Sequence, residues 1–238
     1  MIDYSMLDWE EINPVWEKFS EVSLLDEIHV IRVRISKNID QVLNQKGLLS
    51  QTELEKLDRI VQIQDKNIFL TSTVMKKTLC ALFLNCKPQA VKFEKNEFNK
   101  PLIKDSDIIH FNTTHSGDWV IFIFSANPCG IDIERINYDF DFSGVLKMSF
   151  HRDEIDFVQN ASDKSLSFFQ IWTIKESILK AQGTGLMDNL HELNTLQDFS
   201  NLPTGTDQWQ TKCFKIEEKY WCSLCFKNPF TNMKFFEF

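Results

Sequence analysis

Three short segments rich in β-forming residues lie in the middle of the chain and constrain its fold most strongly. They cover residues 110–114, 119–124 and 130–134. Runs of this length with many β-branched and aromatic residues are typical of strands rather than helices. Asn127-Pro-Cys-Gly130 supplies turn residues between the last two segments, because Pro fixes φ and Gly accepts positive φ. We therefore expect residues 119–124 and 130–134 to form a β-hairpin.

Further strands are predicted on both sides of this region. Residues 28–35 alternate in the way a half-buried strand does, with His29, Ile31, Val33 and Ile35 on one side and Arg32 and Arg34 on the other. Towards the end of the sequence, segments near 208–214, 220–226 and 233–238 also have strand composition. The second of these contains Cys222-Ser-Leu-Cys225, which we interpret as part of the strand because no second cysteine pair completes a zinc site.

Helices are predicted from caps and from apolar residues at helical spacing. Ser50-Gln-Thr-Glu53 is a capping box that starts one helix, a longer helix is expected over 66–84, and a third over 167–182 ends at Gly183. The positions expected to face the core are Leu54, Leu57 and Val61, then Leu70, Val74, Leu79 and Leu82, then Phe168, Ile171, Ile174 and Ile178. Strands and helices grouped in this way indicate an α+β fold with largely antiparallel sheets.

Charge and apolar content exclude several classes of protein. The 238 residues are 43% hydrophobic, which suffices for a core, and their net charge of −8 argues against general binding of nucleic acids or anionic membranes. The longest apolar run, 119–124, is far shorter than the roughly 20 residues of a membrane span. The first ten residues carry acids where a secretory signal needs bases. We therefore expect a cytoplasmic protein that binds neither nucleic acid nor membrane.

Two acidic residues in the third central segment are candidate metal ligands. Asp132 and Glu134 are two residues apart on a predicted strand, so both carboxylates project from one face, while Ile131 and Ile133 point into the core. Neighbouring carboxylates repel each other unless a cation lies between them, and a small set of oxygen ligands suits Mg²⁺. A solvated strand face has the same spacing, so the pattern alone leaves both interpretations open.

Two other groups of polar residues have suitable chemistry. Glu176 and Lys180 are one helical turn apart, opposite the apolar stripe, although such a pair is most often a surface ion pair. His115-Ser-Gly-Asp118 follows a strand, where an imidazole, a hydroxyl and backbone N–H groups could meet an anion. The sequence lacks the G-x-S-x-G elbow of serine hydrolases. None of these signals is specific by itself.

The order of the blocks along the chain is specific. Asn99-Lys-Pro101 precedes Phe111-Asn-Thr-Thr-His-Ser-Gly-Asp-Trp119, and Gly130-Ile-Asp-Ile-Glu134 precedes Trp172-Thr-Ile-Lys-Glu-Ser-Ile-Leu-Lys180 with Gly183-x-Gly-Leu186. Together these blocks resemble the Sfp-type 4′-phosphopantetheinyl transferases, whose two signature blocks, G-I-D-I-E and W-T-x-K-E-S-x-x-K, are both intact. The resemblance runs from about residue 50 to 190.

The resemblance implies a fold and an activity. The expected fold has two similar α+β halves related by a pseudo-twofold axis, residues 1–126 and 127–238, with the metal and catalytic carboxylates in the second half and the nucleotide in the cleft. The expected activity moves the 4′-phosphopantetheine arm of coenzyme A (CoA) onto a serine of an apo acyl- or peptidyl-carrier protein. Adenosine 3′,5′-bisphosphate is released, and the enzyme is expected to act as a monomer.

The resemblance also implies roles for individual residues. Asp132, Glu134 and Glu176 would hold Mg²⁺, or Mn²⁺ in its place, on the diphosphate of CoA. Glu176 would be the general base and Lys180 would contact the phosphates as the bisphosphate leaves. The residues implied to bind CoA are Lys56, Lys100, Thr114, His115, Asp132 and Lys180.

One departure from the family pattern keeps an alternative open. Where the family usually has an Arg followed by a small or hydroxylated residue, this chain has Ile68 and Phe69. Lys66, Lys76 and Lys77 are close in sequence and are candidates to compensate. Without compensation, the chain would be a degenerate member that binds CoA or a carrier protein without turnover. A third hypothesis is another Mg²⁺-dependent phosphoryl enzyme, such as a phosphodiesterase, which would hydrolyse a nucleotide without any carrier.

Overall fold

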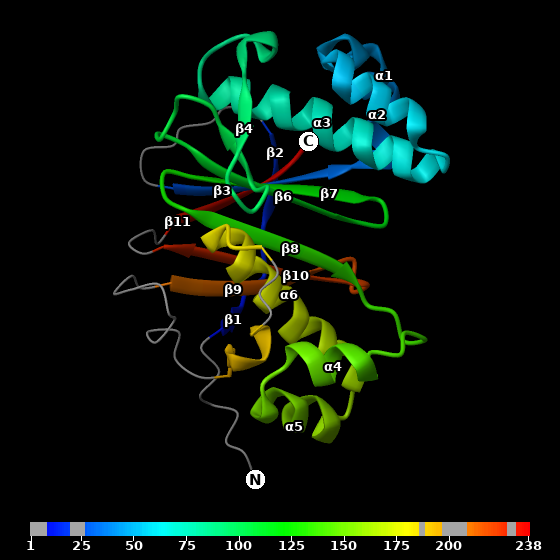
Figure 1. Ribbon diagram of the computed structural model, residues 1–238, viewed down its shortest axis with the longest axis vertical. Coiled ribbons are helices and arrows are strands. Elements are labelled where there is room, and N and C mark those ends of the chain that lie inside the picture. Colours follow the sequence, from blue (N-terminus) through cyan, green and yellow to red (C-terminus); the bar gives the residue numbers. More distant parts are fainter. Residues whose placement is uncertain (1–8, 20–26, 186–188, 197–208, 228–231) are drawn as a thin grey trace.

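Two β-sheets pack face to face at the centre of the molecule, and helices cover the outer face of each (Figure 1). The computed structural model describes residues 9–19, 27–185, 189–196, 209–227 and 232–238. One sheet has the strand order β2-β11-β3-β7-β6 and the other the order β1-β9-β10-β8, and β4 and β5 form a small separate ribbon. Among the described residues, no helix is both long and apolar enough to cross a membrane.

The first half of the chain runs from a strand through three helices to a hairpin. Its elements are β3 (Glu27–Arg34), α1 (Ile35–Asn44), α2 (Gln51–Arg59), α3 (Ile63–Phe83), β4 (Phe93–Lys95), β5 (Pro101–Ile103), β6 (His110–Ser116) and β7 (Trp119–Ser125), with short 3₁₀ helices at Lys46–Leu48 and Pro88–Ala90. β3 pairs antiparallel with β7, and β7 pairs antiparallel with β6. The three helices cover the outer face of this sheet (Figure 1).

The second half repeats this plan. Its elements are β8 (Cys129–Arg135), α4 (Ser143–Ser149), α5 (Arg152–Asn160), α6 (Lys164–Gln182), a 3₁₀ helix at Leu190–Glu192, β9 (Trp209–Ile216) and β10 (Tyr220–Lys227). β8 pairs antiparallel with β10, and β10 pairs antiparallel with β9. The order of elements and the strand pairings match those of the first half, so the molecule is an α+β protein of two similar halves with mainly antiparallel sheets.

The strands near the chain ends pair across the two halves. β1 (Trp9–Glu11) runs parallel to β9, whereas β11 (Asn232–Glu237) runs parallel to β3 on one side and to β2 (Trp16–Lys18) on the other. We propose that the halves meet at residues 126–127, because the chain changes from one sheet to the other between β7 and β8.

The core between the two sheets explains the apolar composition of the central strands. Val30, Ile121, Ile131 and Leu224 are all fully buried there. The other face of β7 packs against α1 and α3, so all seven of its residues are buried, in agreement with its almost entirely apolar sequence. β3 is covered in the same way: Ile28 and Val30 are buried as well as Ile31. The prediction that this strand is only half-buried is therefore wrong.

Most predicted elements are confirmed, but two residues that were predicted to face the core are exposed. The capping box at Ser50 is formed, Gly183 caps α6 with φ +74°, and the stripe from Phe168 to Ile178 is buried. Val61, however, lies beyond the end of α2 and is 87% exposed, and Leu82 lies at the C-terminal end of α3 and is 48% exposed. Of the residues predicted in strands and signature blocks, Leu186 and residue 208 lie outside the described part.

The predicted hairpin of residues 119–124 and 130–134 is wrong. β7 pairs with β3 and β6, whereas β8 pairs with β10 in the other sheet. The Asn127–Gly130 segment turns the chain from one layer to the next, and a turn of that composition serves either purpose. The hairpin is instead formed by β6 and β7, which are joined through Gly117 at φ +56°.

Candidate active site

Strand β8 presents its two carboxylates to helix α6. Ile131 and Ile133 are fully buried between the sheets, so Asp132 and Glu134 project from the opposite face, as the alternation predicted. Asp132 is 4% exposed, and Glu134 is partly exposed at the end of the strand. A solvated strand face is therefore excluded for Asp132.

Side chains of β6 hold the free edge of β8. Among the described strands, β8 pairs with β10 alone, along one edge. On its other edge, three backbone N–H groups donate hydrogen bonds to side-chain oxygens of β6: Ile131 to Asn112 at 3.1 Å, Ile133 to Thr114 at 3.3 Å, and Arg135 to Ser116 at 3.0 Å. The donors on β8 and the acceptors on β6 are both spaced by two residues, so these hydrogen bonds fix the position of Asp132 and Glu134 relative to β6. These hydrogen bonds were not predicted, although polar residues at alternate positions of β6 are a usable signal.

Gly130 allows α6 to lie unusually close to β8. A Cβ atom at position 130 would lie 2.1 Å from the carbonyl oxygen of Ser177 and 2.3 Å from the backbone nitrogen of Ala181. No side chain fits there, so the first residue of the G-I-D-I-E block is needed for packing rather than for a turn. The close contact brings Glu176 and Lys180 of α6 over the carboxylates of β8.

Lys180 is the cation paired with Asp132. Its Nζ lies 2.5 Å from Asp132 Oδ1, which also accepts a hydrogen bond from the Thr114 hydroxyl at 3.0 Å. The same Nζ lies 3.5 Å from Thr114 Oγ1. Asp132 Oδ2 is buried and has no hydrogen-bond partner among the described residues. The Thr114 hydroxyl thus donates its proton to Asp132 and orients that carboxylate. The expected contact of Thr114 with a nucleotide stays a prediction.

Burial raises the pKa values of all three acidic side chains, and Asp132 raises those of Glu134 and Glu176 further. Burial, followed by the charge of Asp132, raises the pKa of Glu134 to about 7. Burial and then Asp132 also raise the pKa of Glu176, and burial raises that of Asp132 itself, opposed by Lys180. Such a cluster favours either protonation or an added cation.

A divalent cation fits this donor set. The buried Asp132 Oδ2 lacks a partner, and carboxylate oxygens are preferred ligands of Mg²⁺. In the described residues no three acidic, histidine or cysteine side chains already converge closely enough to coordinate an ion, and the Lys180 ammonium lies on Asp132.

One pocket opens on the side of Glu176 and Lys180. Its volume is about 310 Å³, and it lies between the Phe98–Pro101 turn, strand β6 and the C-terminal end of α6. Phe98 is half exposed, and the aliphatic part of the wall includes Pro101 and Leu179. This pocket thus offers apolar surface beside one carboxylate and one ammonium group.

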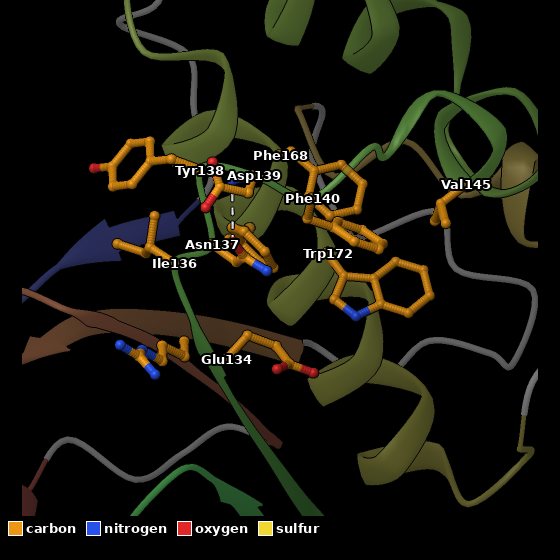
Figure 2. Close-up of a pocket in the computed structure, with 11 residues that line it drawn as sticks. Glu134, Ile136, Asn137, Tyr138, Asp139, Phe140, Val145, Phe168 and Trp172 are labelled. Carbon is orange, nitrogen blue, oxygen red and sulfur yellow. Dashed lines mark hydrogen bonds between the residues drawn. The ribbon is translucent and has the colours of Figure 1, made fainter.

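A larger pocket opens on the side of Glu134. It has a volume of about 630 Å³ and lies between the end of β8, the following loop and α6. Figure 2 shows Glu134 extending towards Trp172 at the base of this pocket, with Phe140 and Phe168 beside Trp172 and Tyr138 directed away. The wall formed by Phe140, Val145, Phe168, Phe169 and Trp172 is apolar. The carboxylates therefore lie between two pockets of different character.

The remaining predicted residues take different positions. Lys100 Nζ donates to the carbonyl oxygens of Ala181 at 3.0 Å and Cys129 at 3.3 Å, so it caps the end of α6 while it lines the smaller pocket. His115 is exposed, and partial desolvation together with Lys180 lowers its pKa. Lys56 lies on α2 with its Nζ 5.0 Å from the centre of the Phe69 ring. Among the described residues, no hydrogen bond or ion pair joins His115 or Lys56 to the carboxylates, although the charge of Asp132 acts on His115.

A buried ion pair beside Glu176 was not predicted. Lys175 and Glu154 are both fully buried, with Nζ and Oε2 2.9 Å apart. Lys175 also donates to the Leu190 carbonyl at 3.0 Å, and Glu154 Oε1 accepts from Thr195 N at 2.7 Å. This network joins α5, α6 and the 190–195 segment directly behind Glu176. A lysine among apolar residues on the inward face of a helix is the signal that was missed.

Comparison with known proteins agrees with both halves of the chain. Residues 37–127 match the family model described as 4′-phosphopantetheinyl transferase, N-terminal, and residues 128–225 match the 4′-phosphopantetheinyl transferase superfamily. The 4′-phosphopantetheinyl transferase gsp of Aneurinibacillus migulanus is 35% identical over 67% of this chain and 67% of its own length. The transferase Sfp of Bacillus subtilis is 27% identical over 77% of this chain and 84% of its own length. The human L-aminoadipate-semialdehyde dehydrogenase-phosphopantetheinyl transferase is 27% identical over 71% and 60%, respectively.

Proposed function

Since the chain belongs to the 4′-phosphopantetheinyl transferase superfamily and is an enzyme that transfers phosphopantetheine, we propose that its donor is CoA and its acceptor a serine of an apo acyl- or peptidyl-carrier protein. One observation carries this proposal: Asp132 and Glu134 of β8 meet Glu176 and Lys180 of α6 between two pockets. CoA has its reactive diphosphate in its middle, with a nucleotide at one end and a flexible arm at the other. The charged groups between the two pockets match the diphosphate between the two ends of CoA.

The two pockets receive the two ends of CoA. The smaller pocket offers Phe98, Pro101 and Leu179 to the flat adenine ring, with Lys180 at its edge. The apolar pocket beside Glu134 is larger and takes the arm. Between them, the diphosphate meets Lys180, whose ammonium is free to exchange its pairing with Asp132 for a phosphate oxygen.

Mg²⁺, for which Mn²⁺ can substitute, would be held by Asp132, Glu134 and Glu176, and when bound it supplies positive charge at the diphosphate. Thr114 orients Asp132 through the 3.0 Å hydrogen bond, and the backbone hydrogen bonds from β8 to side chains of β6 hold the strand that carries both carboxylates. These residues form the rigid side of the site, and Glu176 forms the side that faces the acceptor.

Glu176 accepts the proton of the acceptor serine. The serine oxygen forms a bond to the β-phosphorus while the bond from that phosphorus to the bridging oxygen breaks, and the bridging oxygen leaves with adenosine 3′,5′-bisphosphate. The raised pKa of Glu176 makes it a stronger base than an ordinary carboxylate at neutral pH. Lys180 balances the negative charge that develops on the leaving phosphate.

We propose that the enzyme acts as a monomer, with Asp132, Glu134, Glu176 and Lys180 of one chain forming its site. The net charge of −8 argues against nucleic acid as a partner, and we propose a cytoplasmic location, where CoA and carrier proteins are available. The degenerate-member alternative is less well supported, since Asp132, Glu134, Glu176 and Lys180 are brought together as turnover requires.

Intact-mass analysis of carrier proteins tests the proposal. A panel of apo carriers is incubated with the enzyme, CoA and Mg²⁺, and a parallel series contains EDTA. We expect a gain of one phosphopantetheine on at least one carrier with Mg²⁺ and none with EDTA. CoA binding without modification of any carrier would contradict the proposal and favour the degenerate member.

A further inference from the structure

A turn of the first half lies against the C-terminal end of α6. The turn joins β4 to β5 and is built around Asn96, whose Oδ1 accepts hydrogen bonds from the backbone N–H groups of Phe98 at 3.0 Å and Lys100 at 2.8 Å. The Nδ2 of Asn96 donates to the carbonyl oxygen of Gly183 at 2.8 Å, directly after α6. The conformation of the turn is therefore coupled to the position of the helix end.

Lys100 extends this contact to the crossing of α6 and β8. Its Nζ donates to the carbonyl oxygen of Ala181, in the last turn of α6, at 3.0 Å and to that of Cys129, the first residue of β8, at 3.3 Å. Gly130, the next residue of β8, is the close contact between the strand and the backbone of Ala181. One ammonium group thus joins a turn of the first half to both elements that carry the charged groups of the site.

The end of α6 requires such partners. The last carbonyl groups of a helix have no partner within it and carry partial negative charge, so an ammonium group is favoured beside them. Lys100 satisfies the Ala181 carbonyl, and Asn96 satisfies that of Gly183. The missing side chain of Gly183 leaves room for the turn, since a Cβ atom there would lie 3.0 Å from both Asn96 Nδ2 and Lys100 Cδ. The first half thus supplies a cap for this helix.

This cap lies next to the reactive groups in the chain. Lys180, whose Nζ is 2.5 Å from Asp132 Oδ1, directly precedes Ala181, and Glu176 is one turn before Lys180. A displacement of α6 along β8 would move Glu176 and Lys180 together relative to Asp132. Small misplacements of catalytic groups lower a reaction rate strongly, so the cap bears on turnover without touching the reacting atoms.

These contacts favour a role for Lys100 that differs from the one implied by the family resemblance. Two of the three N–H donors of its ammonium group are used inside the protein. We propose that Lys100 is a positioning residue, which together with Asn96 holds α6 at its crossing with β8 and contributes little to CoA binding. This inference rests on the proposed function, since it takes CoA as the donor.

Kinetics and binding separate the two roles of Lys100, which also lines the smaller pocket. For Lys100→Met we expect kcat for carrier modification at saturating CoA to fall by roughly tenfold or more. The affinity for CoA, measured by isothermal calorimetry with Mg²⁺, should change by less than about threefold, whereas a lost phosphate contact would weaken it by roughly ten- to a hundredfold. Lys95→Met removes an exposed lysine from β4 of the same ribbon and should behave as wild type.

Asn96→Ala gives an independent comparison, because Asn96 does not line the smaller pocket. It removes the hydrogen bonds that shape the turn and the one to the Gly183 carbonyl. We expect the same pattern as for Lys100→Met, with a lower kcat and an unchanged affinity for CoA. This variant also carries the test if Lys100→Met does not fold.

Hydrogen exchange followed by mass spectrometry tests the cap without turnover. The N–H of Gly183 donates to the Leu179 carbonyl at 2.8 Å and reports on the last turn of α6. In Lys100→Met and in Asn96→Ala we expect the amides of this turn to exchange roughly two- to tenfold faster than in the wild type, as the loss of one hydrogen bond predicts. Lys95→Met should leave their exchange unchanged.

Two results would overturn the inference. One is a Lys100→Met variant, folded by circular dichroism, that has the wild-type kcat but binds CoA ten- to a hundredfold more weakly, since Lys100 would then be a CoA-binding residue. The other is wild-type exchange at the end of α6 in both variants. Faster exchange in a protein that modifies no carrier would support the cap while contradicting the proposed acceptor.

Discussion

Asp132, Glu134 and Glu176 carry more negative charge than Lys180 balances. Lys180 pairs with one oxygen of Asp132 and leaves the other oxygen buried and unpartnered. The pKa of Glu134 is raised to about 7, and that of Glu176 is raised as well. At the scale of single residues, the site is therefore under electrostatic strain that a bound cation would relieve. Two predictions follow from the charges of these side chains.

Glu176→Gln keeps the size of the side chain and removes both its charge and its basicity. We expect the rate of carrier modification to fall by at least about a hundredfold with folding preserved, which is the usual effect of losing a general base. Intact-mass time courses measure the rate. Glu17→Gln, on exposed strand β2, removes the same charge far from the site and should leave the rate unchanged. A Glu176→Gln enzyme with wild-type turnover would contradict the role of Glu176.

Glu134 makes the stability of the metal-free protein depend on pH. Its pKa in the folded state, about 7, is above its ordinary value of 4.5, so its favourable contribution is complete below the unfolded pKa and is lost as the pH rises through the folded pKa. In EDTA, we expect a lower melting temperature at about pH 8 than at about pH 5, and a smaller difference for Glu134→Gln. Calorimetry at the two pH values measures this.

Asp132 and Glu176 shift in the same direction, so the Glu134→Gln variant should retain part of the dependence. Addition of Mg²⁺ at the higher pH should raise the melting temperature of the wild-type protein, because the ion binds the folded state. An identical pH dependence in the two proteins would show that Glu134 is not the titrating group.

At the scale of elements, the site depends on how closely α6 lies against β8. Gly130 permits this approach, and the hydrogen bonds from β8 to Asn112, Thr114 and Ser116 hold the strand in register. The buried pair of Lys175 and Glu154 fixes the other side of α6. Glu176 and Lys180 are thus positioned by contacts on two sides of one helix.

Gly130→Ala tests the close approach. The new Cβ would meet the backbone of Ser177 and Ala181, so we expect the free energy of unfolding to fall by about 1–3 kcal/mol and turnover to fall with it. Gly144→Ala in α4 is the control: no atom lies within 4 Å of its Cβ position, so stability should be unchanged or higher by up to about 1 kcal/mol. Urea unfolding measures both. Equal effects of the two substitutions would contradict the packing role of Gly130.

Local sequence patterns predict the elements well but not their partners. Alternation correctly places Asp132 and Glu134 on one face, and the capping box and Gly183 locate helix ends. The hairpin prediction fails because the Asn127–Gly130 turn has the same composition whether the chain reverses within a sheet or moves to the next one. The contact of Lys76 with Phe93 joins separate elements, and no local pattern records it.

At the scale of the whole molecule, two similar halves place a reactive centre between two pockets. The second half supplies the carboxylates and the larger pocket, and the first half supplies β6 and Lys100. The strands near the chain ends, β1 and β11, pair across the halves, and these pairings are long-range and invisible to sequence periodicity. The family resemblance, carried by ordered blocks rather than by periodicity, predicted the two-half arrangement.

The central claim is that the transfer couples release of the nucleotide to modification of a carrier. The most direct test quantifies adenosine 3′,5′-bisphosphate and modified carrier in the same reaction, with and without the carrier. We predict one nucleotide released for each arm attached, and no release when the carrier is left out. Release of nucleotide without a carrier would identify a phosphodiesterase instead, and would contradict the account.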